Sequence, residues 1–157
     1  MRLVGIRFNF KGEKDMRMHK GKPVFSYKDT YSLDSTLSQI ILAGLVKFRD
    51  TLKERDLNGK IYGVPLFDDN YEDEPQSDKW FEILAKMIFA FDDKNEPDVS
   101  SYKIGFELSS DKSGGFCSIS VSNQEGYDQY YKDMEDWNKK KQDGLDLFAK
   151  HYNSLWW

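Results

Sequence analysis

The chain has 157 residues, of which 32% are charged and 15% are aromatic, and its formal net charge is −4. This length suits one sizeable core, so we predict a single domain over residues 1–157. The acidic balance argues against direct nucleic-acid binding, which needs a dominant basic surface. Cys117 is the only cysteine, so no intramolecular disulfide can form, and no apolar run reaches the roughly 20 residues of a membrane helix. We therefore expect a soluble protein of a reducing cytoplasm, with no membrane contact.

The N-terminal residues predict two strands joined by a connection. Apolar and polar side chains alternate from Arg2 to Phe10, which is the period of a half-buried strand. Residues 11–23 contain four lysines and two glycines and indicate a turn or a connection. The segment Pro23–Tyr27 then predicts a short second strand that can pair with the first.

A long central helix is predicted over residues 32–56. Ser32 can cap its N-terminus, and Asp34 lies in the first turn, where the helix dipole favours a carboxylate. Seven apolar residues follow the spacing of one buried helical face: Leu33, Leu37, Ile40, Ile41, Leu45, Phe48 and Leu52. Gly59 is the expected terminator beyond the helix.

Two more helices and a hairpin complete the predicted elements. The second helix covers residues 77–91, and its apolar face is Trp80, Leu84, Met87, Ile88 and Phe91. Alternating residues on both sides of a glycine pair predict a hairpin over 101–123. Helical spacing then covers residues 125–155, although Gly144 disfavours a helix by about 1 kcal/mol and leaves a break open there. The predicted fold class is α+β, with three main helices and a small antiparallel sheet from the N-terminal strands and the hairpin.

Three segments of the chain resemble one protein family. In chain order they read DTYSLDSTLSQIILAGLVKF, WFEILAKMIFAFDD and GLDLFAKHYNSLWW. They resemble a group of uncharacterised tailed-bacteriophage proteins with an Asp-Thr-Trp/Tyr-x-Met/Leu-Asp helix start and a C-terminal Phe-x-x-Tyr/Phe-x-x-Leu-Trp helix. In this chain Tyr31 stands where that group usually has Trp, and Ser35 stands where His is common. The resemblance implies a phage protein in the host cytoplasm, but it implies no activity.

The sequence contains no recognisable catalytic set. His19, His151 and Cys117 are far apart, and no Gly-Lys-Ser/Thr motif of a phosphate loop is present. The pairs Asp128–Lys132 and Glu135–Lys139 have the spacing of helix ion pairs. We therefore predict no catalytic residue, no metal site and no cofactor.

The turn that opens the central helix is the first candidate binding site. Asp29, Tyr31, Ser32 and Asp34 bring carboxylates, hydroxyls and an aromatic ring to a helix start, where backbone N–H groups also point outward. A structural role is the interpretation that we prefer for this turn. In that case Asp29 or Ser32 caps the helix, Asp34 complements its dipole, and Tyr31 packs on the core.

Tryptophans are the other candidate binding residues. Trp80 or Trp137 can offer a stacking wall, and the terminal Trp157 is hard to bury and suits an interface. Two functional hypotheses follow. The first is a non-enzymatic protein that binds a host or phage macromolecule, for example as an inhibitor of a bacterial defence or of a nucleic-acid-handling host enzyme. The alternative is a small-ligand or nucleotide-binding protein, a trap or a metal-dependent hydrolase, that uses the Asp29–Asp34 turn. Both hypotheses are compatible with a homo-oligomer.

Overall fold

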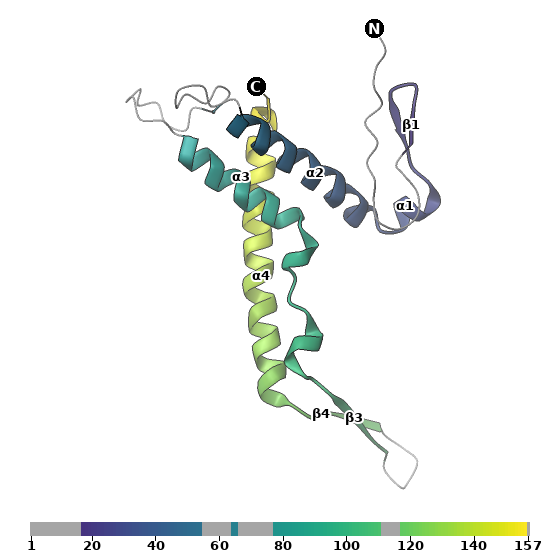
Figure 1. The fold of residues 1–157 in the computed structure, drawn as a ribbon. Coiled ribbons are helices and arrows are strands. Elements are labelled where there is room, and N and C mark those ends of the chain that lie inside the picture. Colours follow the sequence, from purple (N-terminus) through teal and green to yellow (C-terminus); the bar gives the residue numbers. More distant parts are fainter. Residues whose placement is uncertain (1–16, 55–63, 66–76, 111–116, 157) are drawn as a thin grey trace. The chain divides into compact units, whose positions relative to one another are not determined.

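The computed structural model describes residues 17–54, 64–65, 77–110 and 117–156 (Figure 1). The chain divides into two compact units, Met1–Ile40 and Ile41–Trp157. Helix α2 (Leu33–Glu54) runs through the boundary between them. The division is therefore not by itself a domain boundary, and the single domain stays a prediction.

The first unit contains a hairpin in the segment that the sequence indicated as a connection. Strands β1 (Arg17–His19) and β2 (Lys22–Val24) pair antiparallel. Lys20 and Gly21 have φ angles of 50° and 77°, the left-handed conformation that a two-residue hairpin turn requires. The predicted connection over residues 11–23 is therefore wrong for residues 17–19 and for Lys22. The strand predicted over residues 2–10 lies outside the described residues.

Helix α1 (Tyr27–Tyr31) begins where the sequence predicted the end of a strand. The Ser26 side chain accepts a hydrogen bond from the backbone N–H of Asp29 at 3.4 Å, and the Asp29 carboxylate accepts one from the backbone N–H of Ser26. This reciprocal pair is a capping box, which satisfies two backbone donors at a helix start. Tyr27 is therefore helical, and the strand predicted over residues 23–27 is confirmed only as far as Val24.

Helix α2 begins one residue after Ser32, which is also the C-terminal cap of α1. The second half of its predicted apolar face belongs to or borders the core: Ile41, Leu45, Phe48 and Leu52. Leu33 and Leu37, in the first half, are exposed by 42% and 40%. The prediction of one continuous buried face is therefore wrong for these two residues. Gly59, the expected terminator, lies outside the part of the chain that the structure describes.

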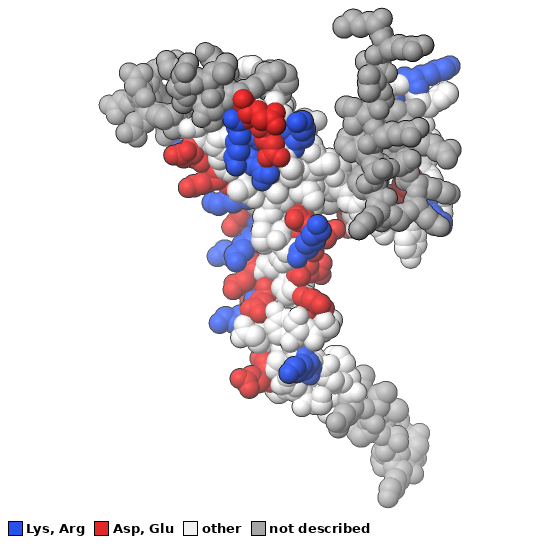
Figure 2. Space-filling view, in the orientation of Figure 1, with Lys and Arg blue, Asp and Glu red and all other residues white. Residues whose placement is uncertain are grey.

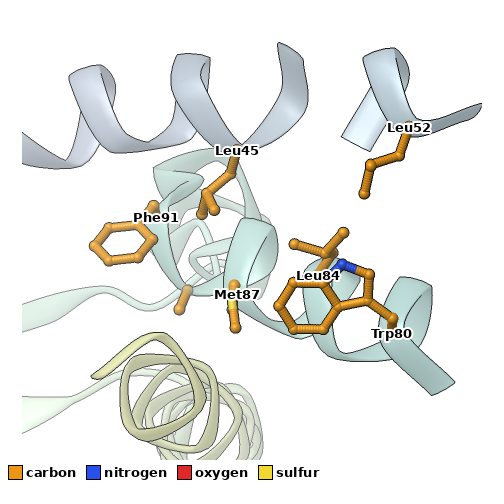
Figure 3. Packing of buried hydrophobic residues seen from close by; sticks show 7 residues of the cluster. Leu45, Leu52, Trp80, Leu84, Met87 and Phe91 are labelled. Atoms are coloured by element: carbon orange, nitrogen blue, oxygen red, sulfur yellow. The ribbon is translucent and has the colours of Figure 1, made fainter. Parts of the chain in front are cut away.

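The core of the second unit lies where α2 meets α3 (Ser77–Phe91), whose bounds match the prediction (Figure 3). Its buried side chains come from two helices: Leu45 and Leu52 from α2, and Trp80, Leu84, Met87, Ala90 and Phe91 from α3. The α3 residues recur every three or four positions, so one helical face carries them all. The ring of Phe148 from α4 (Gln124–His151) meets the ring of Phe91 edge-on, with 5.0 Å between centroids.

Helices α3 and α4 pack closely at Gly144. A Cβ atom at this position would lie 2.3 Å from the carbonyl oxygen of Lys86 and 2.7 Å from the Cβ of Ala90. Glycine therefore allows the two backbones to approach. Helix α4 continues unbroken through Gly144 to His151, and the turn η3 (Tyr152–Ser154) follows it.

A connection and a second hairpin join α3 to α4. They consist of η1 (Asp93–Asn95), η2 (Val99–Tyr102), β3 (Phe106–Ser110) and β4 (Cys117–Val121). The hairpin predicted over residues 101–123 is confirmed by the pairing of β3 with β4, with Phe106 opposite Val121. The β1–β2 and β3–β4 pairs are separate sheets of two strands each, so the described residues form no joint sheet. The helical core of the predicted fold is confirmed.

Candidate functional site

The structure places the predicted Asp29–Asp34 turn in the first unit, where Asp29 has a structural role. Its carboxylate belongs to the capping box of α1, and its carbonyl accepts a hydrogen bond from the Thr36 hydroxyl at 3.0 Å. Asp34 is exposed in the first turn of α2, as the dipole argument expected. Tyr31 is 83% exposed, so its expected packing on the core is wrong.

The candidate tryptophans are less accessible than a stacking wall requires. Trp80 is fully buried, and its ring meets the ring of His151 edge-on with 5.6 Å between centroids. Trp137 is 9% exposed, and the ammonium of Lys141 lies 4.5 Å from its ring centroid. Trp157 lies outside the described residues. Stacking of a ligand on Trp80 is therefore excluded in this conformation.

A groove on α4 brings together aromatic and charged side chains that the sequence analysis did not assign to a site. We call it the tyrosine groove. Its volume is about 720 Å³, and its lining residues are Tyr127, Asp128, Tyr130, Tyr131, Lys132, Met134, Glu135 and Asn138. Most of these positions are three or four residues apart, which places their side chains along one side of a helix. The sequence analysis recognised only the helical spacing of this segment, which a core face and an exposed face share.

The three tyrosine rings of the groove contact one another at different angles. The rings of Tyr127 and Tyr131 lie 4.5 Å apart between centroids and are tilted by 50°. The rings of Tyr130 and Tyr131 lie 5.8 Å apart and are nearly perpendicular, at 81°. Tyr131 is 55% exposed, so its ring is open to a binding partner. The groove therefore presents aromatic surface in more than one direction.

Residues on the connection before the hairpin support the groove from outside α4. The hydroxyl of Tyr102 in η2 donates a hydrogen bond to the Asp133 carboxylate at 2.7 Å, and its ring meets that of Tyr130 at 5.3 Å between centroids. The side chain of Asn123 caps α4 by accepting from the Gly126 N–H at 3.0 Å, and it donates to the Tyr102 carbonyl at 3.0 Å. These contacts hold η2 against the start of α4.

The N-terminal half of α4, which contains the tyrosine groove, carries mainly acidic side chains. Residues 124–138 contain five Asp or Glu and one Lys. Figure 2 shows acidic side chains along α4. Neither Asp128 with Lys132 nor Glu135 with Lys139 forms an ion pair in this described helix, so these two predicted pairs are wrong. Asp128 instead accepts a hydrogen bond from the Gln124 side-chain amide at 2.7 Å.

The pKa values of Tyr127 and Tyr102 are raised by their surroundings. Hydrogen bonding with Tyr131, desolvation and the charge of nearby Asp128 raise the pKa of Tyr127 above its usual value. The Asp133 carboxylate, which accepts a hydrogen bond from the Tyr102 hydroxyl, likewise raises the pKa of Tyr102. The electrostatic character of the groove therefore comes from its carboxylates and from the negative faces of its rings.

A second hollow lies on the α3–α4 pair and is mostly apolar. Its volume is about 360 Å³, and it is lined by Ala85, Lys86, Phe89, Lys140 and Asp143. Within the described ranges, no three potential ligand side chains gather as a metal site would require. None of the described helices is both long enough and apolar enough to cross a membrane.

Comparison of the chain with protein-family models, with curated proteins and with solved structures finds no match.

Proposed function

We propose that this chain is a non-enzymatic phage protein of the host cytoplasm that binds a host or phage protein through the tyrosine groove. The observation that carries the proposal is the accessible cluster of Tyr127, Tyr130 and Tyr131 on α4. Tyrosine is enriched in protein interfaces because it supplies contact area with little loss of side-chain entropy. The resemblance to tailed-phage proteins supplies the phage origin and the host location.

The proposed partner is a protein whose activity can be blocked by binding alone, because the proposed function involves no catalysis. Binding alone can block an active site or an assembly surface of a bacterial defence protein or a host enzyme. The acidic residues of α4 suit partners that handle nucleic acid, because such proteins expose basic surfaces. The small-ligand alternative has less support, because Trp80 is buried and Asp29 caps a helix.

A pull-down with the full chain tests this function. We expect the wild-type chain to retain a bacterial protein from lysate at physiological salt, and Tyr131→Ala to lose most of it. Tyr31→Ala is the matched control, because Tyr31 is an exposed tyrosine of the Asp29–Asp34 turn. Neither tyrosine is buried, at 83% exposed for Tyr31 and 55% for Tyr131, so neither change should disturb folding by more than about 1 kcal/mol.

Each outcome of the pull-down has a definite meaning. Loss of the partner with Tyr131→Ala alone supports the groove. Loss with Tyr31→Ala alone moves the binding site to the predicted turn and contradicts the groove. A wild-type chain that retains no protein in lysates of several bacterial hosts contradicts the proposed function.

A further inference from the structure

We propose that the tyrosine groove binds a lysine or arginine side chain of the partner protein. This inference rests on the proposed function. The groove combines aromatic ring faces with carboxylates, and both attract a cation. A cation within about 6 Å of a tyrosine centroid is attracted by the negative face of the ring. A carboxylate beside the ring adds a charge-assisted hydrogen bond.

The ring arrangement suits a side chain that enters between aromatic surfaces. Tyr130 and Tyr131 are nearly perpendicular, at 81°, and Tyr127 is tilted by 50° from Tyr131. Rings that face different directions can contact both the apolar stem and the charged end of a long basic side chain. Met134 continues the apolar part of the lining.

The carboxylates of the groove can bind a cation supplied by the partner. Within the described part of the chain, the Glu135 carboxylate makes no ion pair or hydrogen bond, and the Asp128 carboxylate receives only the neutral Gln124 amide. Lys132 is the one basic residue of the lining, and it forms no ion pair with a described residue. A basic side chain of the partner would therefore meet carboxylates that have no cationic partner among the described residues.

Charge also argues against a nucleic acid as the occupant. A nucleic acid would bring its phosphates against five carboxylates and one lysine between residues 124 and 138. A second copy of the chain is the competing occupant, because residues 1–40 contain eight Lys or Arg and four Asp or Glu. We assign the site to a different protein and make self-association an outcome of the test.

The test uses the full chain and two synthetic probes. One is a short peptide of alternating glycine and arginine, and the other replaces each arginine by citrulline, which has nearly the same shape and no charge. Backbone amide NMR signals report where each peptide binds. We expect saturable shifts at residues 127–138 with the arginine peptide, and binding of the citrulline peptide that is weaker by about tenfold or more.

Three variants separate the groove from the general charge of the protein. Tyr131→Ala and Glu135→Gln should each weaken binding of the arginine peptide by about threefold to tenfold. Glu82→Gln removes the same charge from an exposed position of α3 and should leave binding unchanged. Equal effects of Glu82→Gln and Glu135→Gln, or equal binding of both peptides, would overturn the proposal. A wild-type dimer in sedimentation that Tyr131→Ala converts to a monomer would overturn it in favour of a second copy.

The cation site and the proposed function can fail separately. If Tyr131→Ala releases the captured partner but the double variant Asp128→Asn/Glu135→Gln retains it, the protein-binding function stands and the cation site is wrong. If the arginine peptide binds as expected but the chain captures no protein, the cation site stands and the proposed function is wrong.

Discussion

Gly144 shows how one residue fixes the packing of two helices. Inside a helix glycine is less favourable than alanine by about 1 kcal/mol, because it loses more backbone entropy. Here the missing side chain lets the α4 backbone lie against Lys86 and Ala90 of α3, where a Cβ would be 2.3 Å from a carbonyl oxygen. A backbone atom cannot move aside as a flexible side chain can, so the close packing outweighs the helix propensity.

A pair of glycine substitutions tests this conclusion. Gly144→Ala should lower the free energy of unfolding by about 1–2 kcal/mol, because overpacking against the backbone exceeds the gain in helix propensity. Gly44→Ala in α2 should raise it by about 0.5–1 kcal/mol, because a Cβ there would meet no atom within 4 Å beyond its chain neighbours and the backbone of its own helix. Urea denaturation measures both changes, provided that the slope of the unfolding free energy against urea concentration is the same in each variant as in the wild type. A stabilising Gly144→Ala would mean that α3 and α4 are less tightly packed than described.

At the scale of single elements, the two halves of α2 have different surroundings. Its second half contributes Leu45 and Leu52 to the core, while Leu37 in the first half is 40% exposed. A side chain that is already partly in water loses little when it is shortened, whereas a fully buried one leaves a cavity.

Leucine truncations along α2 measure this difference. Leu52→Ala should cost about 2–5 kcal/mol of unfolding free energy, because Leu52 is fully buried. Leu37→Ala should cost less than about 1 kcal/mol, because Leu37 is partly exposed. Chemical denaturation of the two variants beside the wild type gives both numbers. Equal losses would show that the whole apolar face of α2 is covered in solution, as its sequence pattern predicted.

The elements that could be predicted are those with a strong and uninterrupted pattern. Helix α3 combines an apolar face with flanking loop residues, and its bounds were predicted as observed. Helix α1 was missed because its start depends on the reciprocal hydrogen bonds of Ser26 and Asp29, in a segment too short to show a period. The strand β1 was missed because it has three residues and depends on its turn.

The candidate site could be predicted only in part, for a physical reason. Asp29 and Asp34 were recognised as residues of a helix start, and the structure places Asp29 in a cap. The tyrosine groove was missed because Tyr127 and Tyr131 have the spacing of a core face. Helical spacing shows that side chains share a face, but it does not show whether another element covers that face. The density of carboxylates around these tyrosines was the one available signal of exposure.

At the scale of the whole molecule, one buried histidine connects the end of α4 to the core. His151 is 8% exposed and packs against Trp80. Burial, with a smaller contribution from the charge of Lys150, lowers the pKa of His151 below its usual value. The folded chain therefore holds this imidazole neutral at a pH where the unfolded chain protonates it.

The stability of the helical core should consequently fall on mild acidification. The unfolded state binds more protons than the folded state below about pH 6.5, so unfolding becomes easier as the pH falls toward the lowered pKa of His151. Thermal denaturation should show a larger fall in Tm between pH 7.5 and pH 5.5 for the wild type than for His151→Gln. His19→Gln, at an exposed hairpin position, should keep the wild-type fall. The same fall in all three proteins would mean that His151 does not contribute.

The two halves of α4 differ in how firmly they are held. Between Gln124 and Asp136 no residue of this described helix is buried, while Trp137, Gly144 and His151 are buried further along. Local opening requires little free energy where few contacts are lost, so the half with the tyrosines can fray while the half against α3 stays folded. A partner that binds the groove would then also order this end of the helix. Part of the interaction free energy would go into that ordering, which favours complexes that are specific but readily reversible.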